Sequence, residues 1–363
     1  MKIAQIRTGR LSVPLRKPFK TALRTVSQVD DVIVEIATDN GLVGYGEAAP
    51  TAVITGETIS SITGSIKEVI TPVLLGADIE NIEEVMKRLE TCIAKNTSAK
   101  AAVDIAVSDL YGQLYQAPLY KLWGGYRRTL TTDITISVNE PEQMAQDSLQ
   151  AVQLGYDILK IKVGKDSAKD IERLRAVRQA VGGNVKIRID ANQGWHPKEA
   201  VQVLRKMEDE GLELELVEQP VIAHDFEGLK YVTDNTTIPV MADESVFSPI
   251  DALKIMQMRA ADLVNIKLMK TGGIHNALKI CAMAEVYGME CMIGCMLEGK
   301  ISVTAAVHLA AAKRIITKID LDGPVLCSFD PIEGGASFNE SKISIGEEPG
   351  FGFKRLNGVI WDN

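Results

Sequence analysis

The sequence of 363 residues contains few of the residues from which disulfide frameworks and zinc sites are built. It has five cysteines and four histidines; the cysteines form no Cys-x-x-Cys pair, and the histidines are scattered singly. An odd number of dispersed cysteines favours reduced thiols that pack in the interior. If the protein holds a metal ion, its ligands are therefore expected to be oxygen atoms. The five cysteines are Cys92, Cys281, Cys291, Cys295 and Cys327.

The sequence also lacks an excess of positive charge and long apolar runs. Its net charge is −8, which argues against nucleic acids and anionic membranes as main partners. No apolar run approaches the length of a membrane span, and the N-terminal stretch "MKIAQIRTGRLSV" has no signal-peptide core. With 46% hydrophobic and 24% charged residues, the composition is typical of a globular protein, which we expect in the cytoplasm.

Residues 1–126 show strands followed by helices. The turn "TDNG" joins two of the expected strands, and "LWGG" ends the region with a glycine stop. This order is typical of an α+β module. The expected strands span 2–13, 29–38 and 41–48, and the expected helices span 57–74, 80–94 and 97–116.

Strands and helices alternate over residues 127–323. Eight strands at this spacing favour an α/β fold of the (β/α) barrel type over an open sheet. The chain then becomes irregular and rich in glycine, and we expect residues 324–363 to return to the first module. The expected strands are "TDITISV", "ILKIKV", "VKIRID", "ELELVEQ", "IPVMAD", "DLVNIKL", "MECMIG" and "TKIDLD". The expected helices include 141–154, 168–181, 197–210, 249–260, 275–287 and 300–313.

Charged and amide side chains gather at the carboxyl ends of these strands, where barrel enzymes place their active sites. From the second to the sixth strand, roughly 24 to 28 residues separate one charged residue from the next, the length of one strand–helix unit. We therefore expect these side chains to converge. In chain order they are Lys160, Lys162, Asp190, Asn192, Glu218, Asp243, Glu244, Asn265, Lys267, Asp320 and Asp322.

Asp190, Glu218 and Asp243 come from three consecutive strands. Three neighbouring carboxylates repel one another unless a cation joins them. Because no histidine or cysteine lies nearby in the pattern, a hard divalent ion is indicated, and Mg²⁺ fits best because it keeps coordination positions open for substrate oxygen. The alternative is that each carboxylate caps the helix that follows it.

Lys162 and Lys267 flank these carboxylates from the second and sixth strands. A lysine near a divalent cation has a lowered pKa and can act as a general base. Two such lysines could remove a proton from one face of a carbon and return one to the other face, with the metal stabilising the enolate between the two steps. Lys160, on the same strand face, would help keep Lys162 neutral by repulsion. The alternative is a purely structural network of lysines and carboxylates.

The motifs "KIK", "DAN", "EQP", "DES" and "NIKLMKTGG", in this order, resemble the enolase superfamily in its muconate lactonizing enzyme subgroup. The resemblance covers nearly the whole chain. It implies a modified (β/α)8 TIM barrel of the (β/α)7β type, with an N-terminal α+β capping domain. It also implies one Mg²⁺ per subunit, an enolate mechanism with lysine bases, which is general in that superfamily, and a homo-oligomer. Asn192, Glu244 and Asn265 would support the metal ligands.

The subgroup contains cycloisomerases, succinylbenzoate synthases, N-acylamino acid racemases and dipeptide epimerases. In the epimerases, an Asp-x-Asp at the position of Asp320 and Asp322 binds the free α-ammonium of the substrate. A succinylbenzoate or muconate substrate has no ammonium, so this acidic pair would repel it. The alternative is a cap or turn before Gly323 and Pro324.

Further substrate contacts follow from the same resemblance. Arg24, in the loop "FKTALRT", resembles an arginine that pairs with a glutamate side chain, and its guanidinium matches carboxylate geometry. The second capping loop, 51–58, is small and apolar and suits a lid over a compact substrate. Thr135 resembles a pocket residue, while Met296 and Leu297 resemble a pocket wall.

The function of Glu298 and of Cys295 stays open at this point: Glu298 could hold part of the substrate's ammonium or nothing, and Cys295 is expected to be inert packing. The resemblance implies a dipeptide epimerase that inverts the α-carbon of the C-terminal residue, with L-Ala-L-Glu and L-Ala-D-Glu as the leading pair. This activity would fit turnover of murein-derived peptides. The alternatives are an o-succinylbenzoate synthase or N-acylamino acid racemase on the same scaffold, or a small-peptide binder without catalytic activity.

Overall fold

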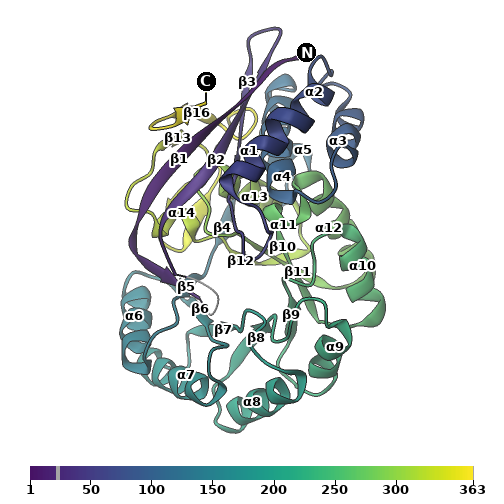
Figure 1. Ribbon diagram of the computed structural model, residues 1–363. Helices are drawn as coiled ribbons and strands as arrows, with labels where there is room; N and C mark the ends of the chain where they lie inside the picture. Colours follow the sequence, from purple (N-terminus) through teal and green to yellow (C-terminus); the bar gives the residue numbers. More distant parts are fainter. Residues whose placement is uncertain (22–24, 363) are drawn as a thin grey trace.

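The computed structural model describes residues 1–21 and 25–362, and its elements form an N-terminal part that lies over one end of a barrel (Figure 1). The N-terminal part is built on a four-stranded antiparallel sheet in the order β17-β1-β2-β3. Its strands are β1 (Ile3–Lys20), β2 (Thr25–Thr38), β3 (Val43–Ala48) and β17 (Ile360–Trp361). The last of these comes from the end of the chain, so both termini lie at this sheet.

The β1–β2 hairpin is longer than the sequence pattern predicts. Pairing continues past Pro14 to Phe19, which pairs with Val26, and to Lys20, which pairs with Thr25. The register shifts between Pro14 and Phe19, where proline lacks an amide donor and the alternation of side chains is lost. The extension carries Phe19 from the capping sheet to the barrel.

Helices cover one face of this sheet. The predicted helix over 57–74 is present in three pieces with a π-helical middle, and α4 packs directly on β3. Gly46 makes this close approach possible, because a Cβ atom there would lie 1.8 Å from the carbonyl oxygen of Ala102. The helices are α1 (Ile59–Gly64), η1 (Ser65–Ile70), α2 (Thr71–Leu74), α3 (Ile82–Thr91), α4 (Thr97–Leu114) and α5 (Leu119–Leu122).

The barrel is an eight-stranded parallel sheet in which every strand pairs with its neighbours in chain order. Hydrogen bonds bridge the seam between its first and last strands, since Leu321 N donates to Thr132 Oγ1 at 2.9 Å and Asp133 N donates to the Ile319 carbonyl at 3.3 Å. The barrel is therefore nearly closed. Its strands are β5 (Ile134–Ile136), β6 (Ile158–Lys162), β7 (Lys186–Asp190), β8 (Leu214–Glu218), β9 (Val240–Ala242), β10 (Leu263–Lys267), β11 (Glu290–Gly294) and β12 (Ile316–Asp320).

Helices surround this sheet and complete the predicted architecture. Each strand from β5 to β11 leads into a helix of nine residues or more, directly or, after β10, through the short α11. The α/β fold class, with a (β/α)7β barrel and an N-terminal α+β part, is confirmed. The helices are α6 (Pro141–Gln153), α7 (Ser167–Val181), α8 (Pro197–Asp209), α9 (Phe226–Asp234), α10 (Pro249–Met258), α11 (Leu268–Thr271), α12 (Ile274–Tyr287), α13 (Lys300–Ala312) and α14 (Gly323–Leu326).

Helix α9 is an element that the sequence pattern missed. It is short, and its N-cap is Asp225, whose Oδ1 accepts a hydrogen bond from Gly228 N at 2.8 Å. This aspartate is the one available signal of the helix start. The predicted domain boundaries after residues 126 and 323 stay predictions.

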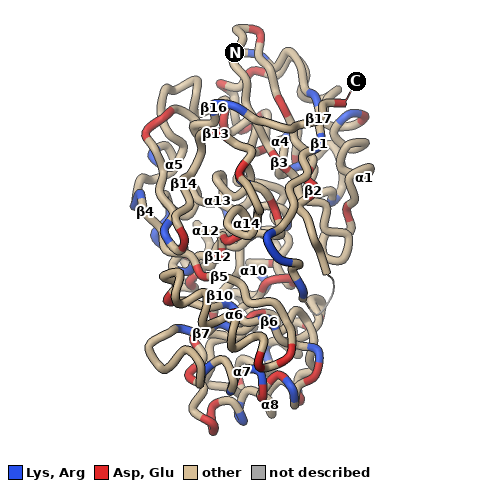
Figure 2. Tube along the Cα trace, turned by 90° about the vertical axis from the view of Figure 1, so that its left-hand side faces the viewer, with Lys and Arg blue, Asp and Glu red and all other residues tan. Residues whose placement is uncertain are grey.

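Short strands also precede and follow the barrel in the chain. Strand β4 pairs with β15, and β13 pairs with β16. Lys and Arg are interspersed with Asp and Glu in both parts of the chain (Figure 2). Among the residues that the structure describes, no helix has both the length and the apolar character needed to cross a membrane. These strands are β4 (Thr129–Thr131), β13 (Ile332–Gly334), β14 (Ser337–Asn339), β15 (Lys342–Ser344) and β16 (Phe353–Leu356).

A buried ion-pair group lies in the amino half of the barrel interior. Arg188 is buried there and donates to Asp133 at 2.8 Å and to Glu215 at 2.6 Å. Because the guanidinium is paired on both sides, its charge is compensated inside the barrel. A separate cluster of buried apolar side chains consists of Leu216, Met241, Leu263 and Met292.

The contact between β3 and α4 gives a stability prediction. In Gly46→Ala, the added methyl group meets backbone that cannot move aside, so we expect the free energy of unfolding to fall by about 3 kcal/mol. Gly64→Ala is the matched control, because Gly64 is helical and a Cβ atom there meets nothing within 4 Å. This control should raise stability by about 0.5–1 kcal/mol. Thermal unfolding of both variants checks the prediction, and equal melting temperatures would contradict it.

Candidate active site

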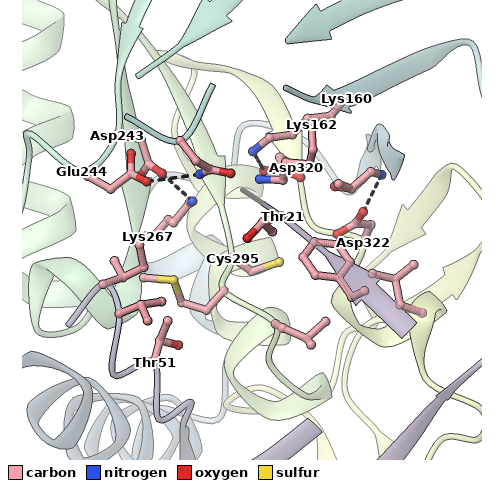
Figure 3. Close-up of a pocket in the computed structure, with 18 residues that line it drawn as sticks. Thr21, Thr51, Lys160, Lys162, Asp243, Glu244, Lys267, Cys295, Asp320 and Asp322 are labelled. Carbon is pink, nitrogen blue, oxygen red and sulfur yellow. Dashed lines mark hydrogen bonds and ion pairs between the residues drawn. The ribbon is translucent and has the colours of Figure 1, made fainter. Parts of the chain in front are cut away.

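Five consecutive strands bring the predicted lysines and carboxylates together at one end of the barrel. Figure 3 shows Lys162, Asp243 and Lys267 of this group. The register pairs Lys162 with Asp190 and Asp190 with Glu218. Asp243 follows β9, and Lys267 ends β10. Since β7, β8 and β9 lie between β6 and β10, the three carboxylates lie between the two lysines. All five side chains are buried.

In the structure each of the two lysines forms an ion pair with its nearest carboxylate. Lys162 Nζ lies 2.5 Å from Asp190 Oδ2. Lys267 Nζ lies 2.7 Å from Asp243 Oδ2 and 3.8 Å from Glu218 Oε1. Burial alone would lower the pKa of Lys267, but the attraction of Asp243 and Glu218 outweighs it and raises that pKa. The ion pairs expected of a purely structural network of lysines and carboxylates are therefore present.

Lys160 is the most deeply paired lysine of the group. Its Nζ lies 2.7 Å from Glu218 Oε2, 2.7 Å from Asp320 Oδ2 and 3.3 Å from Asp190 Oδ2. Burial opposes its charge, yet these carboxylates raise the pKa of Lys160 well above its ordinary value. Because its charge is compensated by three carboxylates, the structure gives no support to the prediction that Lys160 acts on Lys162 by repulsion.

The three carboxylates do not act as helix caps. The residues at the N-caps of α8, α9 and α10 are His196, Asp225 and Ser248. The capping alternative is therefore wrong. Asp190, Glu218 and Asp243 are instead buried side by side at the strand ends, where lysines form ion pairs with them.

These carboxylates differ in pKa because lysine contacts are distributed unevenly. Burial and the neighbouring Asp190 raise the pKa of Glu218 to about 7. Burial also opposes ionisation of Asp243, but Lys267 and Lys270 outweigh it and lower the pKa. A buried carboxylate that holds a proton near neutrality lacks sufficient positive charge around it.

The residues present have the chemistry of a divalent-metal site. Three carboxylates from adjacent strand ends are the hard oxygen ligands that Mg²⁺ takes. Among the described residues, however, no group of three or more histidine, cysteine or acidic side chains is arranged around a common point as metal ligands. Lysine ammonium groups lie among Asp190, Glu218 and Asp243 instead. The three carboxylates therefore fit Mg²⁺ as ligands. In this structure their oxygen atoms are paired with lysines.

Of the three residues predicted to support these carboxylates, Asn265 and Asn192 donate hydrogen bonds to them, and Glu244 is bonded to Asn192. Asn265 Nδ2 donates to Glu218 Oε1 at 2.8 Å. The backbone N–H of Asn192 donates to Asp190 Oδ1 at 2.9 Å, and its Nδ2 donates to Glu244 Oε1 at 3.2 Å. Burial, and then repulsion by Asp243, raise the pKa of Glu244 to about 8.

Lys270 is a site residue that the sequence analysis missed. It is fully buried, its Nζ lies 2.6 Å from Asp243 Oδ1, and it also donates to the carbonyl oxygens of Asp243 and Asn265. Burial lowers the pKa of Lys270, against the attraction of Asp243. Its position in α11, one helical turn after Lys267 in "NIKLMKTGG", was the available signal.

Asp320 and Asp322 lie at the other side of the pocket, at the seam of the barrel (Figure 3). Asp322 Oδ2 accepts a hydrogen bond from the backbone N–H of Thr135 at 2.7 Å, and Thr135 also lines the pocket. Asp322 precedes α14 but makes no side-chain capping bond, so the cap alternative has no support. Burial and repulsion by Asp320 raise the pKa of Asp322 to about 6.

The pocket is closed by walls from both parts of the chain. Met296 and Leu297 line it, as predicted, and Cys295 lies beside them. Burial raises the pKa of the Cys295 thiol well above its ordinary value, which makes it a poor nucleophile. Arg24 lies outside the described residues. The N-terminal part contributes Phe19, Thr21, Thr51, Val53 and Ile54, of which the sequence analysis singled out only the loop 51–58.

Glu298 does not line this pocket. Its Oε1 accepts a hydrogen bond from the backbone N–H of Met296 at 2.6 Å, and its side chain is buried. Burial raises the pKa of Glu298 to about 7. Glu298 therefore holds the loop that carries Met296 through this hydrogen bond.

Two protein-family models together match nearly all of the chain. Residues 4–124 match the N-terminal domain of the mandelate racemase / muconate lactonizing enzyme family, and residues 143–355 match the enolase C-terminal domain-like family. The chain belongs to the enolase superfamily. The predicted resemblance is confirmed.

Individual members of the superfamily are close in sequence and structure. The L-Ala-D/L-Glu epimerase of Clostridium acetobutylicum is 65% identical over 98% of this chain and 100% of that protein. The substrate-liganded L-Ala-D/L-Glu epimerase from Bacillus subtilis superposes with a TM-score of 0.97 at 53% identity, covering 98% of this chain and 99% of that one. A dipeptide epimerase from Enterococcus faecalis, complexed with Mg and L-Leu-L-Tyr, superposes with a TM-score of 0.95 at 46% identity, covering 98% and 100%.

The pairing of Lys270 with Asp243 gives a prediction about the stability of this protein. In Lys270→Met the side-chain volume is nearly kept, but Asp243 loses a buried partner, so we expect the free energy of unfolding to fall by about 3 kcal/mol. Lys87→Met is the control, because Lys87 is exposed on α3 and its replacement should change stability by no more than about 0.5 kcal/mol. Thermal unfolding measures both, and a Lys270 variant as stable as the Lys87 variant would refute this pairing.

Proposed function

We propose that the protein is a Mg²⁺-dependent dipeptide epimerase that inverts the α-carbon of the C-terminal residue, with L-Ala-L-Glu and L-Ala-D-Glu as substrate and product. The observation that carries this proposal is the position of Lys162 and Lys267 on opposite sides of three buried carboxylates. Two lysines placed in this way can serve opposite faces of one carbon. The names of the relatives at 65% and 53% identity support the same reaction and substrate pair.

Asp190, Glu218 and Asp243 would hold one Mg²⁺ per subunit. The relative from E. faecalis that was solved with Mg and a dipeptide supports this assignment. When bound, the ion would offset part of the charge of these carboxylates and supply positive charge for the negative charge that develops on the substrate when the α-proton leaves. Asp243 and Glu218 would then raise the pKa of Lys267 less, and burial, which lowers that pKa, would favour the neutral, basic form.

The two lysines exchange protons with the α-carbon. One lysine, in its neutral form, removes the α-proton, which leaves an enolate of the C-terminal residue. The other lysine, in its ammonium form, donates a proton to the opposite face and inverts the centre. The same pair works in reverse on the other epimer, so each lysine serves as base for one epimer and as acid for the other.

The groups at the seam would bind the amino end of the dipeptide. Asp320 and Asp322 take the α-ammonium, while Lys160 keeps Asp320 in place through the ion pair at 2.7 Å. Thr135, Met296 and Leu297 shape the pocket around the first residue. Arg24 is proposed, on sequence resemblance alone, to pair with the glutamate side chain. A homo-oligomeric state, a cytoplasmic location and turnover of murein-derived peptides stay predictions.

The buried acidic pair weighs against the alternatives on the same scaffold. An o-succinylbenzoate synthase or an N-acylamino acid racemase acts on a substrate without a free ammonium, next to which Asp320 and Asp322 would be left unpaired or repelled. A binder without catalysis would not need lysines on both sides of the carboxylates. Solvent deuterium at the α-carbon of a bound dipeptide separates an enzyme from such a binder.

Substitution of the two lysines tests the reaction scheme. In Lys162→Ala and in Lys267→Ala, epimerisation of L-Ala-L-Glu should be lost, by at least about 10³-fold. Each variant should still exchange the α-proton of one epimer with solvent deuterium, because one base remains. Proton NMR in deuterium oxide, with chiral analysis of the product, follows both events. Epimerisation by either single variant at a rate near that of the wild type would exclude the two-base scheme.

Removal of the metal tests the cofactor assignment. We expect a chelator to abolish epimerisation and added Mg²⁺ to restore it, because the substrate's α-carboxylate then regains its positive partner. Mg²⁺ should also raise the melting temperature of the chelator-treated protein, since it binds only the folded state. Glu218→Gln should lose this thermal shift while the exposed control Glu142→Gln keeps it. Full activity in the presence of chelator would argue against the metal.

A further inference from the structure

The hydroxyl group of Thr51 is a buried polar group that the scheme above does not use. Thr51 lies in the loop after β3, is 1% exposed and lines the pocket on the side of Lys267 (Figure 3). Its Oγ1 has no hydrogen-bond partner among the described residues. A buried hydroxyl without a partner costs free energy, so a position of this kind indicates a missing hydrogen-bond acceptor.

The backbone around Thr51 is held in place. The carbonyl oxygen of Thr51 accepts hydrogen bonds from the N–H groups of Ile54 and Thr55, both at 2.9 Å. The loop therefore forms a turn that presents the Thr51 side chain to the pocket independently of any ligand. The buried hydroxyl is therefore part of a pocket wall whose backbone is held in one conformation.

The wall around Thr51 is otherwise mostly apolar. Phe19, Val53 and Ile54 line it together with the hydroxyl-bearing Thr21 and Thr51, while the described charged groups of the pocket all come from the barrel. The barrel groups account for the substrate's α-carboxylate and ammonium under the proposed function. The side chain of the inverted residue is then the part of the dipeptide left to face this wall.

We propose that the Thr51 hydroxyl donates a hydrogen bond to the side-chain carboxylate of the dipeptide's C-terminal residue, and so selects an acidic residue at the centre that is inverted. This inference rests on the proposed function. An apolar side chain would leave the hydroxyl buried and unpaired, whereas a glutamate side chain accepts its hydrogen bond. Sites built to form a hydrogen bond discriminate against substrates that cannot complete it.

Thr55 in the same turn shows what a purely structural threonine looks like. Its Oγ1 donates to the carbonyl oxygen of Thr51 at 3.3 Å, accepts from Glu57 N at 3.4 Å and contacts Ser98 Oγ at 3.4 Å. The side chain of Thr55 therefore stabilises the turn. Thr51 has no such bonds to lose, which makes the two threonines a matched pair for an experiment.

The experiment compares Thr51→Val, Thr51→Ser and Thr55→Val on L-Ala-L-Glu and on L-Ala-L-Met, whose side chain has similar length but no charge. Thr51→Val should lower kcat/KM for L-Ala-L-Glu about tenfold, chiefly through a higher KM, and leave or raise kcat/KM for L-Ala-L-Met. Thr51→Ser keeps the hydroxyl and should restore the preference for glutamate. Thr55→Val should change the values for both dipeptides by the same factor. If L-Ala-L-Met is bound without turnover, its inhibition constant takes the place of kcat/KM.

The outcomes separate this inference from the proposed function. A Thr51→Val variant with unchanged selectivity, or with equal losses on both dipeptides, would overturn the role of the hydroxyl while leaving the epimerase assignment in place. A failure of the Thr51→Ser variant to restore selectivity would also overturn it. If the wild-type protein epimerises neither dipeptide, the proposed function fails, and this inference fails with it.

Discussion

The compensation of buried charge at the carboxyl ends of the barrel strands is the constraint on which the rest of the structure depends. Asp190, Glu218 and Asp243 are at most 1% exposed, and repulsion between them in such a place is strong. Lysines on the flanking strands, and Lys270 beneath Asp243, balance part of this charge. Burial and the neighbouring Asp190 still raise the pKa of Glu218, and a bound cation would lower it.

The capping part adds a wall to the pocket at these strand ends. The extended β1–β2 hairpin delivers Phe19 to the pocket, and the turn after β3 delivers Thr51. Both depend on the sheet lying close to α4, which glycine at position 46 permits. Under the proposed function, recognition of the substrate side chain and chemistry at its α-carbon would thus belong to different parts of the chain, which meet at one pocket.

Much of the barrel could be predicted because parallel strands read plainly in a sequence. Buried strands such as "ILKIK" are short apolar-rich runs between helical patterns, and the regular spacing from Lys162 to Lys267 reflects one strand–helix unit per charged residue. The sequence pattern missed helix α9, and it ended the first strand at residue 13, before the hairpin ends. In both, local signals are weak, and pairing or packing with distant residues decides the structure.

The sequence by itself determined the fold class, the order of lysines and carboxylates, and the superfamily, because strand periodicity and motif spacing are local properties of the chain. Only the tertiary structure decided which atoms meet. It paired Lys160 with three carboxylates, bonded Glu298 to the backbone of Met296, placed Lys270 against Asp243 and left the hydroxyl of Thr51 without a partner among the described residues. Such contacts depend on side-chain direction and burial across elements far apart in the chain, and no local pattern encodes them.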